Sequence, residues 1–324
     1  MKIKSSVLIE ELAYDKKCIN YEFYIKGVST INDIKEDTIV FVNKFNNELL
    51  EKVNKLEKVF VLLKEEYRDK IVYNQNSYIF VENPRYEYAR IVDFILANEE
   101  EDYKYIEVNG SYIAENSHID PSVKIEPGVL IGPNVVIGRG TKIFSGSKIK
   151  GNVKIGEDCI IRENSVIGGY GFGFDKDYEG NNFRIPHLGG VVIGNNVEVG
   201  AITTVCSGTI NPTIIRDFAK IDDHVHVAHN VDIGENSIIT ACAEISGSCI
   251  IGKNTWLAPN VAIINGIKIG ENVTIGMGSV VTKSVQDNEV MVGAPAEPLE
   301  EAKKFKKIKS KIVNDAESIF KQQL

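Results

Sequence analysis

The sequence predicts a mainly β chain whose larger part winds as a parallel β-helix, with a small α/β domain before it and a helix after it. Three observations predict this architecture. Isoleucine returns at every sixth residue from Ile113 to Ile167, the same spacing resumes from Ile193 to Val281, and residues 1–100 lack it. A period of six fits neither an α-helix nor an alternating strand. It fits a triangular coil with one aliphatic side chain pointing inward from each side.

The residues around each aliphatic position agree with a narrow coil. Glycine often follows the aliphatic residue, as at Gly132 and Gly252, and suits tight corners. Four residues after the aliphatic position stands a small or β-branched residue such as Thr141. Cys159 and Cys249 occupy this position, so we expect them to be small core side chains. Successive coils would stack about 4.8 Å apart.

The repeat sets the expected domain boundaries. We expect an α/β domain, a linker, a β-helix and a C-terminal loop and helix, over residues 1–100, 101–112, 113–284 and 285–324. In the first domain TIVFVN, KVFVLL and SYIFVE are strand-like, and PRYEYARIVDFILAN begins with proline and has apolar residues at helical spacing. An excursion over residues 168–190 interrupts the repeat.

Composition excludes several classes of protein. The net charge of −8 argues against a nucleic-acid-binding protein. The sequence has no stretch of 18 apolar residues, so no membrane span is expected. Its first residues lack the apolar segment of a secretory signal. Five cysteines without a CxxC pair indicate free thiols and a cytoplasmic protein rather than a disulfide framework.

Coils of this type resemble the hexapeptide-repeat acyltransferases. The resemblance implies that the coils wind left-handed, and that the protein is a homotrimer with active sites in the clefts between neighbouring prisms.

The segment KIDDHVHVAHN, residues 220–230, holds three of the five histidines. Amide synthesis from a thioester requires a base for the amine, stabilisation of the thioester oxygen and a means of holding both reactants. A neutral histidine is a suitable base near pH 7. Asp222 and His229 are seven residues apart, on adjacent sides of one coil, so a carboxylate–imidazole pair is expected. We interpret His224, His226 and His118 as solvated side chains.

The excursion reads GGYGFGFDKDYEGNNFRIPHLGG and is rich in glycine and aromatic residues. No helix follows it, so it is not a dinucleotide-binding loop. A long interruption of a regular repeat is usually functional. We expect it to form a wall of a substrate cleft, with Phe172, Phe174 and His187 as substrate-binding residues.

The C-terminal helix combines an apolar stripe with many lysines. Leu299, Ala302, Phe305, Ile308 and Ile312 would lie on one face of this helix. The lysines form either a solvated face or a dock for an acidic partner, which in this setting would be an acyl carrier protein. The six residues are Lys303, Lys304, Lys306, Lys307, Lys309 and Lys311.

The order of motifs is similar to that of the UDP-3-O-acylglucosamine N-acyltransferases of lipid A biosynthesis, over nearly the whole length. The matching segments are GVSTINDIKEDTIVFVN, VENPRYEYARIVDF, GYGFGF, RIPHLG and KIDDHVHVAHNV. The resemblance implies that His229 deprotonates the amine of a nucleotide-linked amino sugar and that Asp222 orients it. It also implies that Asn43 contacts uracil and that the amine attacks the thioester directly, without an acyl-enzyme. The thioester of acyl-carrier-protein phosphopantetheine or of CoA would be a co-substrate, with no bound cofactor and no metal.

The sequence departs from that family at three places. Val40 and Asn46 stand where two aromatic residues would enclose the base, and Phe41 or Phe45 would have to replace them. Gly266 stands where a second active-site histidine is expected, and Asn265 could donate a hydrogen bond instead. The ending GMGSVVTKSVQDNEVMVGAPAEPL is equally similar to that of acetyl-CoA-dependent sugar acetyltransferases.

Three alternatives remain open from the sequence. One is a sugar acetyltransferase that uses acetyl-CoA. Another is a zinc hydratase resembling the γ-class carbonic anhydrases, because the five-residue spacing of His224 and His229 could suit two zinc ligands. The third is a non-catalytic trimeric scaffold.

Overall fold

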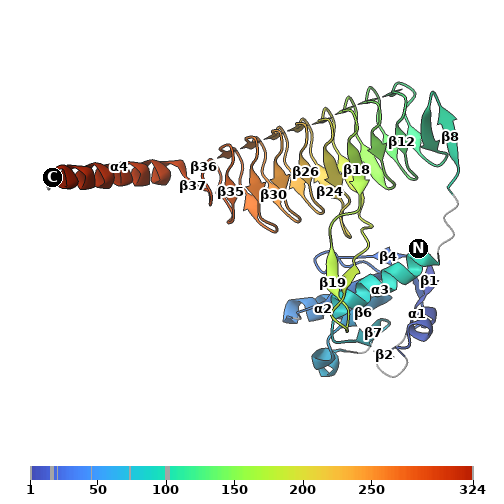
Figure 1. Cartoon of the computed structure of the whole chain (residues 1–324). Coiled ribbons are helices and arrows are strands. Elements are labelled where there is room, and N and C mark those ends of the chain that lie inside the picture. The colour runs from blue at the N-terminus through green and yellow to red at the C-terminus, as the bar shows by residue number, and fades with distance from the viewer. Residues whose placement is uncertain are drawn as a thin grey trace. The chain divides into compact units, whose positions relative to one another are not determined.

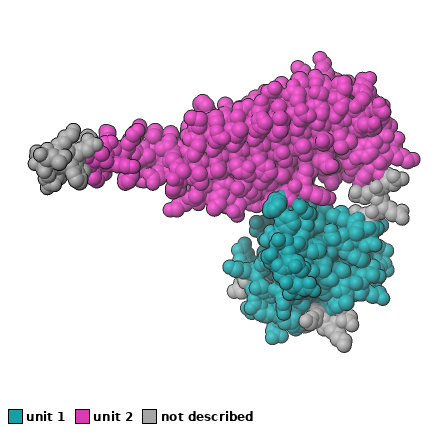
Figure 2. Space-filling view, viewed as in Figure 1, with its two compact units in different colours: residues 1–102, 172–188, 209–211 teal, residues 103–171, 189–208, 212–324 magenta. Residues whose placement is uncertain are grey.

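A computed structural model describes residues 2–14, 18–19, 21–44, 46–72, 74–98 and 103–322. The chain divides into two compact units, which Figure 2 shows in different colours. Unit 1 comprises residues 1–102, 172–188 and 209–211, and unit 2 comprises residues 103–171, 189–208 and 212–324. The chain therefore leaves unit 2 twice to complete unit 1.

Unit 2 is a left-handed parallel β-helix that forms a three-sided prism, followed by a helix (Figure 1). Each strand pairs in register with the strand one coil further along, as Ile131 pairs with Ile149. Identical repeat positions therefore stack coil over coil. The predicted fold class is confirmed.

The three sheets of the prism are named here by their outermost strands in sequence. The β10–β33 sheet contains β10 (His118–Ile119), β13 (Val136–Ile137), β16 (Val153–Ile155), β21 (Val191–Ile193), β24 (Thr213–Ile215), β27 (Asp232–Ile233), β30 (Ile250–Ile251) and β33 (Lys268–Ile269). The β11–β37 sheet contains β11 (Lys124–Ile125), β14 (Lys142–Ile143), β17 (Ile160–Ile161), β22 (Glu198–Val199), β25 (Lys220–Ile221), β28 (Ile238–Ile239), β31 (Trp256–Leu257), β34 (Thr274–Ile275), β36 (Val290–Val292) and β37 (Glu297–Pro298). The β8–β35 sheet contains β8 (Tyr105–Val108), β9 (Ser111–Ala114), β12 (Leu130–Ile131), β15 (Lys148–Ile149), β18 (Val166–Gly169), β23 (Thr204–Cys206), β26 (His226–Val227), β29 (Glu244–Ile245), β32 (Ala262–Ile263) and β35 (Val280–Val281).

The inside of the prism is filled by the aliphatic repeat residues and by the small residues between them. Cys159 and Cys249 are buried in this core, as expected from their repeat position. Thr141 is also buried, and its hydroxyl donates to the carbonyl oxygen of Gly156 at 2.9 Å. Small polar residues thus satisfy their hydrogen bonds inside a narrow apolar interior.

The glycines that follow the aliphatic residues have a different cause from the tight corners expected of them. A methyl group on Gly252 would lie 2.4 Å from the carbonyl oxygen of Gly270 in the next coil. The left-handed backbone conformation falls two residues later, on Asn254 (φ 56°). Glycine is needed here because neighbouring coils approach closely, whereas asparagine makes the turn.

Secondary structure closes both ends of the prism. At the first coil β8 pairs with β9 in an antiparallel hairpin. At the last coil β36 pairs antiparallel with β37, and α4 (Leu299–Gln322) follows directly and extends away from the coils (Figure 1). The expected C-terminal helix is therefore present.

Unit 1 is a small α/β domain around a five-stranded sheet of order β2-β7-β6-β5-β4. Strands β4 to β7 are parallel and β2 is antiparallel to β7. Residues of α1 and α3 pack on one face of the sheet, and residues of α2 pack on the other. The elements are β1 (Ile3–Lys4), α1 (Ser5–Glu11), β2 (Cys18–Ile19), β3 (Tyr24–Ile25), β4 (Gly27–Val28), β5 (Thr38–Val42), α2 (Asn47–Lys55), β6 (Val59–Leu63), η1 (Glu65–Lys70), β7 (Ser77–Phe80) and α3 (Pro84–Ala97).

The excursion forms an antiparallel hairpin, β19 (Phe174–Lys176) with β20 (Asn182–Arg184), that belongs to unit 1. All five cysteines are free thiols. Within the described part of the chain, the helices lack the length and apolar character that crossing a membrane requires.

Candidate active site

His229 lies on a corner of the prism, between β26 and β27. The next residue, Asn230, makes the turn with a left-handed backbone (φ 61°), and its N–H donates to the hydroxyl oxygen of Thr213 at 2.9 Å. The Nδ1 atom of His229 is 3.0 Å from Oδ1 of Asn230. The imidazole is partly exposed, so it can both be held by the protein and meet a substrate.

Asn265 and Gly266 lie on the same corner, two coils beyond His229. The connection is a column of backbone hydrogen bonds: Ser248 N–H donates to His229 at 2.9 Å, and Gly266 N–H donates to Gly247 at 3.0 Å. Two coils correspond to about 10 Å along the prism. Asn265 is exposed, and nothing lies within 4 Å of where a side chain on Gly266 would begin. An amide donor and an open space therefore stand on the same edge as the imidazole.

Asp222 lies on the other corner that flanks β26, directly after β25. Its Oδ1 accepts from the backbone N–H of Asp223 at 2.8 Å, and its Oδ2 accepts from the N–H of Ala241 at 3.0 Å. Within a single chain, Asp222 and His229 therefore lie on different corners of the prism. The pairing of the two residues stays a prediction.

The other histidines of this segment are separated in the same way. His224 makes the turn at the Asp222 corner with φ 58°, and Nε2 of His226 is 3.8 Å from a carboxylate oxygen of Glu244. His118 is exposed on β10, at the far end of the prism. Over the residues that the structure describes, no three or more His, Cys, Asp or Glu side chains are grouped as a metal site would require.

A second group of polar residues lies in unit 1, at the carboxyl ends of its parallel strands. Asn43, Lys64 and Glu82 follow β5, β6 and β7, where they line an open cavity of about 730 Å³. Tyr67 of η1 and Asn83, the N-cap of α3, complete its wall. Ligands of open α/β sheets bind at this edge of the sheet, so the cavity is a candidate binding site for the nucleotide part of a substrate.

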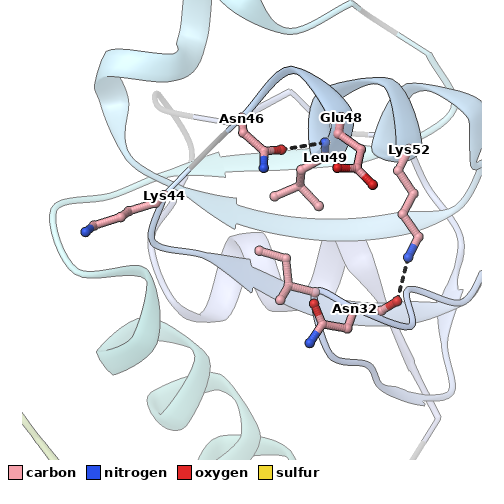
Figure 3. A pocket seen from close by; sticks show the side chains of 7 residues that line it. Asn32, Lys44, Asn46, Glu48, Leu49 and Lys52 are labelled. Carbon is pink, nitrogen blue, oxygen red and sulfur yellow. Dashed lines mark hydrogen bonds between the residues drawn. The ribbon is translucent and has the colours of Figure 1, made fainter.

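A smaller cavity of about 230 Å³ adjoins Lys44, which lines both (Figure 3). Asn46 caps α2 here by accepting from the N–H of Leu49 at 2.8 Å. The Nζ of Lys52 donates to the carbonyl oxygen of Asn32 at 2.6 Å. In this smaller cavity the side chains of Asn46 and Lys52 already bond backbone groups, so the larger cavity is the better candidate for a ligand.

The two positions expected to be aromatic have other roles. Val40 is fully buried in the core and Asn46 is the helix cap, so neither can stack on a base in the cavity. Phe41 packs against Tyr88, with ring centroids 5.0 Å apart, and Phe45 lies outside the described residues. Among the described residues, Tyr67 is the aromatic side chain that lines the cavity. Tyr67 was not expected from the sequence, although the strand-like KVFVLL just before it could have indicated its place.

The hairpin carries the other predicted substrate residues. Phe172 is 87% exposed, and the centroid of its ring is 4.9 Å from that of the Phe174 ring. The Arg184 guanidinium lies over the Phe174 ring, 4.6 Å from its centroid. His187 is buried instead, and its Nδ1 donates to the carbonyl oxygen of Ile185 at 2.9 Å. The exposed Phe172, next to the half-buried Phe174, can meet an apolar group, whereas His187 supports the hairpin from within.

A buried carboxylate holds the hairpin on α3. The side chain of Glu87 is only 3% exposed. One of its oxygens accepts from Tyr178 of the hairpin at 2.8 Å, and the other accepts from Tyr14 and from Arg90. Loss of solvent and the nearby carboxylate raise the pKa of the Tyr178 hydroxyl, so it remains a donor. Asn83 adds a bond to Asp175 at 3.3 Å.

The six predicted docking lysines lie on α4 and are exposed. Nζ of Lys303 pairs with Glu300 at 2.8 Å. Phe305, Ile308 and Ile312 are exposed on the same helix. In one chain, these charged and apolar side chains of α4 therefore all face solvent.

The prism is similar to a known protein family and to known structures. The bacterial transferase hexapeptide family (six repeats) matches residues 110–145, 134–169, 212–247 and 248–283. The prism is a hexapeptide-repeat β-helix. A UDP-N-acetylglucosamine acyltransferase from Bacteroides fragilis has a similar structure, with a TM-score of 0.54 and 27% identity over 60% of this chain and 73% of that one.

Curated relatives narrow the comparison. This chain is 36% identical over 146 residues to the UDP-3-O-acylglucosamine N-acyltransferase of Methylococcus capsulatus. The matched segment covers 45% of this chain and 41% of that one. This chain is 41% identical over 130 residues to the enzyme of the same name from Campylobacter lari, covering 40% of this chain and 41% of that one. The chain thus spans about two fifths of the length of the curated relatives it matches.

Proposed function

We propose that the protein is an N-acyltransferase that moves an acyl group from a thioester to the amine of a nucleotide-linked amino sugar. The observation that carries the proposal is His229 on an exposed prism corner, with Nδ1 at an amide oxygen. The names of the 36–41% identical relatives supply the reaction class. The cavity at the carboxyl ends of β5 to β7 could hold the nucleotide. Asn43 is the residue that we expect to contact the nucleobase.

The chemistry needs two proton transfers and the exchange of a carbon–sulfur bond for a carbon–nitrogen bond. The amine nitrogen attacks the thioester carbonyl carbon while Nε2 of His229 takes a proton from the nitrogen. The oxyanion that develops needs a donor, and the exposed amide of Asn265 is the candidate. When the carbon–sulfur bond breaks, the thiolate leaves and takes the proton from the His229 imidazolium, so that an amide and a free thiol remain and the base is regenerated. No acyl-enzyme forms.

We propose a homotrimer with the reaction in the clefts between prisms. In one chain both oxygens of Asp222 bond the backbone of its own corner. If Asp222 orients His229, it must therefore come from the neighbouring copy. The exposed apolar residues of α4 are further candidates for contact between copies.

We propose acyl carrier protein as the donor, steered by the lysines of α4. Exposed charges of this kind act mainly on the association rate and are screened within about 8–10 Å at physiological salt. Reversing Lys304, Lys307 and Lys311 to Glu should lower kcat/KM with acyl carrier protein several-fold, less so at high salt. Activity with a small acyl-thioester should barely change, which serves as the control.

The test of the proposed function is a thiol-release assay with a panel of acyl carrier proteins, acyl-CoAs and nucleotide amino sugars. Thiol release that depends on the amino sugar supports it. Preference for acetyl-CoA, with no effect of the lysine reversal, would instead assign a short-chain sugar acetyltransferase. Absence of release with every pair would contradict the acyltransferase.

A further inference from the structure

We propose that Gly247 fixes the plane of the His229 imidazole and that Asn230 fixes its tautomer. Both would be positioning residues, which act through His229 rather than on the substrate. The inference rests on the proposed function, in which His229 accepts the amine proton. It concerns a glycine that neither the repeat nor the turn at this corner explains.

Gly247 lies one coil beyond His229 on the same corner, and Ser248 N–H donates to the His229 carbonyl oxygen at 2.9 Å. A methyl group on Gly247 would lie 2.7 Å from both Cε1 and Nε2 of His229, and 3.2 Å from Nδ1. All three distances are short, so the ring occupies the space in which a side chain on Gly247 would begin. Contacts of 2.7 Å are closer than van der Waals separation, so alanine would displace the imidazole.

Backbone geometry does not require this glycine. The left-handed conformation at the corner falls on Ser248 (φ 62°), not on Gly247. At Gly252 the space of a methyl group is taken by the backbone of the next coil, whereas at Gly247 it is taken by a side chain. Gly252 thus serves the stacking of coils, and Gly247 makes room for one imidazole.

Asn230 fixes the other degree of freedom of the ring. Its αL backbone and its N–H bond to Thr213 hold it in place, and its Oδ1 is 3.0 Å from Nδ1 of His229. An amide oxygen only accepts hydrogen bonds, so Nδ1 carries the proton. Nε2 is then the nitrogen that takes the amine proton. A neutral amide therefore does in the single chain what was expected of Asp222.

Displacement of the base should affect turnover more than binding. An error of about 1 Å in the placement of a catalytic group can cost roughly 10²-fold in rate. We therefore expect Gly247→Ala to lower kcat by about 10- to 100-fold with little change in KM. Asn230→Ala should also lower kcat, and Asn230→Asp should restore it while moving the pH–rate profile to higher pH, because a carboxylate stabilises the imidazolium.

The matched control is Gly151→Ala. Gly151 occupies the same corner position several coils away, where the atoms nearest to a methyl group belong to Pro133, the closest at 3.2 Å. This variant should keep the kcat of the wild type. Thermal unfolding of each purified full-length variant shows whether the fold is intact. Nitrogen chemical shifts of ¹⁵N-histidine-labelled wild type report the tautomer of His229, assigned with His229→Ala.

Protonated Nδ1 and unprotonated Nε2, with a selective loss of kcat in Gly247→Ala, is the expected result. A kcat near that of the wild type in Gly247→Ala, or an equal loss in Gly151→Ala, would overturn the role of Gly247. The opposite tautomer in the wild type would overturn the role of Asn230, even if a variant failed to fold. Full activity in His229→Ala would overturn the proposed function itself, so the two failures are distinguishable.

Discussion

The prism and unit 1 are organised by different rules, although each contains candidate site residues of its own. In the prism, a residue lies next to the residues at the same repeat position in the coils before and after it. Val227, for example, pairs with Val205 on one side and with Ile245 on the other. In unit 1 the cavity wall is assembled from the ends of three strands and from two helices. In a repeat, the sequence position of a residue therefore predicts where its side chain lies. A cavity, in contrast, is lined by residues that are far apart in the sequence.

The largest expected effect is on the chemistry of the prism. His229→Ala should lower turnover by roughly 10²–10⁴-fold, the usual range for loss of a positioned base. Because the imidazole is partly exposed on a corner and not in the core, the melting temperature should change little. Steady-state kinetics with the best donor, together with thermal unfolding, measures both. Turnover near that of the wild type would remove His229 from the mechanism.

The next effect tests the buried network of unit 1. Arg90→Met leaves the Glu87 carboxylate buried without its cation, and breaking such a pair costs about 3–5 kcal/mol. Unit 1 should then unfold at lower denaturant concentration, with the hairpin cleaved sooner by protease, while the prism transition stays in place. Arg85→Met is the control, since Arg85 is 46% exposed and 3.7 Å from Asp175, and should cost less than about 1 kcal/mol. Equal effects would show that the network is not a buried one.

This contrast explains what the sequence could predict. The period of six indicated the prism, the buried positions of Cys159 and Cys249 and the column that contains His229 and Asn265. Composition and period could not show that Glu87 is buried, because its partners Tyr14 and Tyr178 lie far away in the chain. The role expected of Asp222 came from its spacing to His229 and from resemblance, and the hydrogen bonds of its carboxylate are visible only in three dimensions.

A smaller effect is expected in the prism at alkaline pH. Burial raises the pKa of the Cys206 thiol to about 11, compared with about 8.5 in an unfolded chain. Since the folded pKa is the higher one, this contribution to stability is fully present below about pH 8.5 and is lost as pH rises towards 11. Cys206→Ala should reduce the fall in stability between pH 8 and 10 by an amount on the order of 1 kcal/mol. Parallel pH curves for the two proteins would contradict this.

The smallest effect is a stabilisation of unit 1. The hydroxyl of Tyr88 is buried and has no hydrogen-bond partner among the described residues. Removing an unsatisfied buried group typically recovers about 1 kcal/mol, so Tyr88→Phe should raise the denaturation midpoint of unit 1 slightly. Tyr14→Phe, which loses its bond to Glu87, should lower it. A loss of stability in Tyr88→Phe would show that the hydroxyl is satisfied in solution.

If the proposed reaction is right, the acyl group goes to a nitrogen, and a comparison of two acceptors tests this. The same UDP-linked amino sugar is offered to the wild-type protein with a free amine and with the amine acetylated, each with an acyl-acyl carrier protein. We predict thiol release only with the free amine, and mass spectrometry should place the acyl group on the nitrogen. Acylation of a hydroxyl group on the acetylated sugar would contradict the account and make the protein an O-acyltransferase.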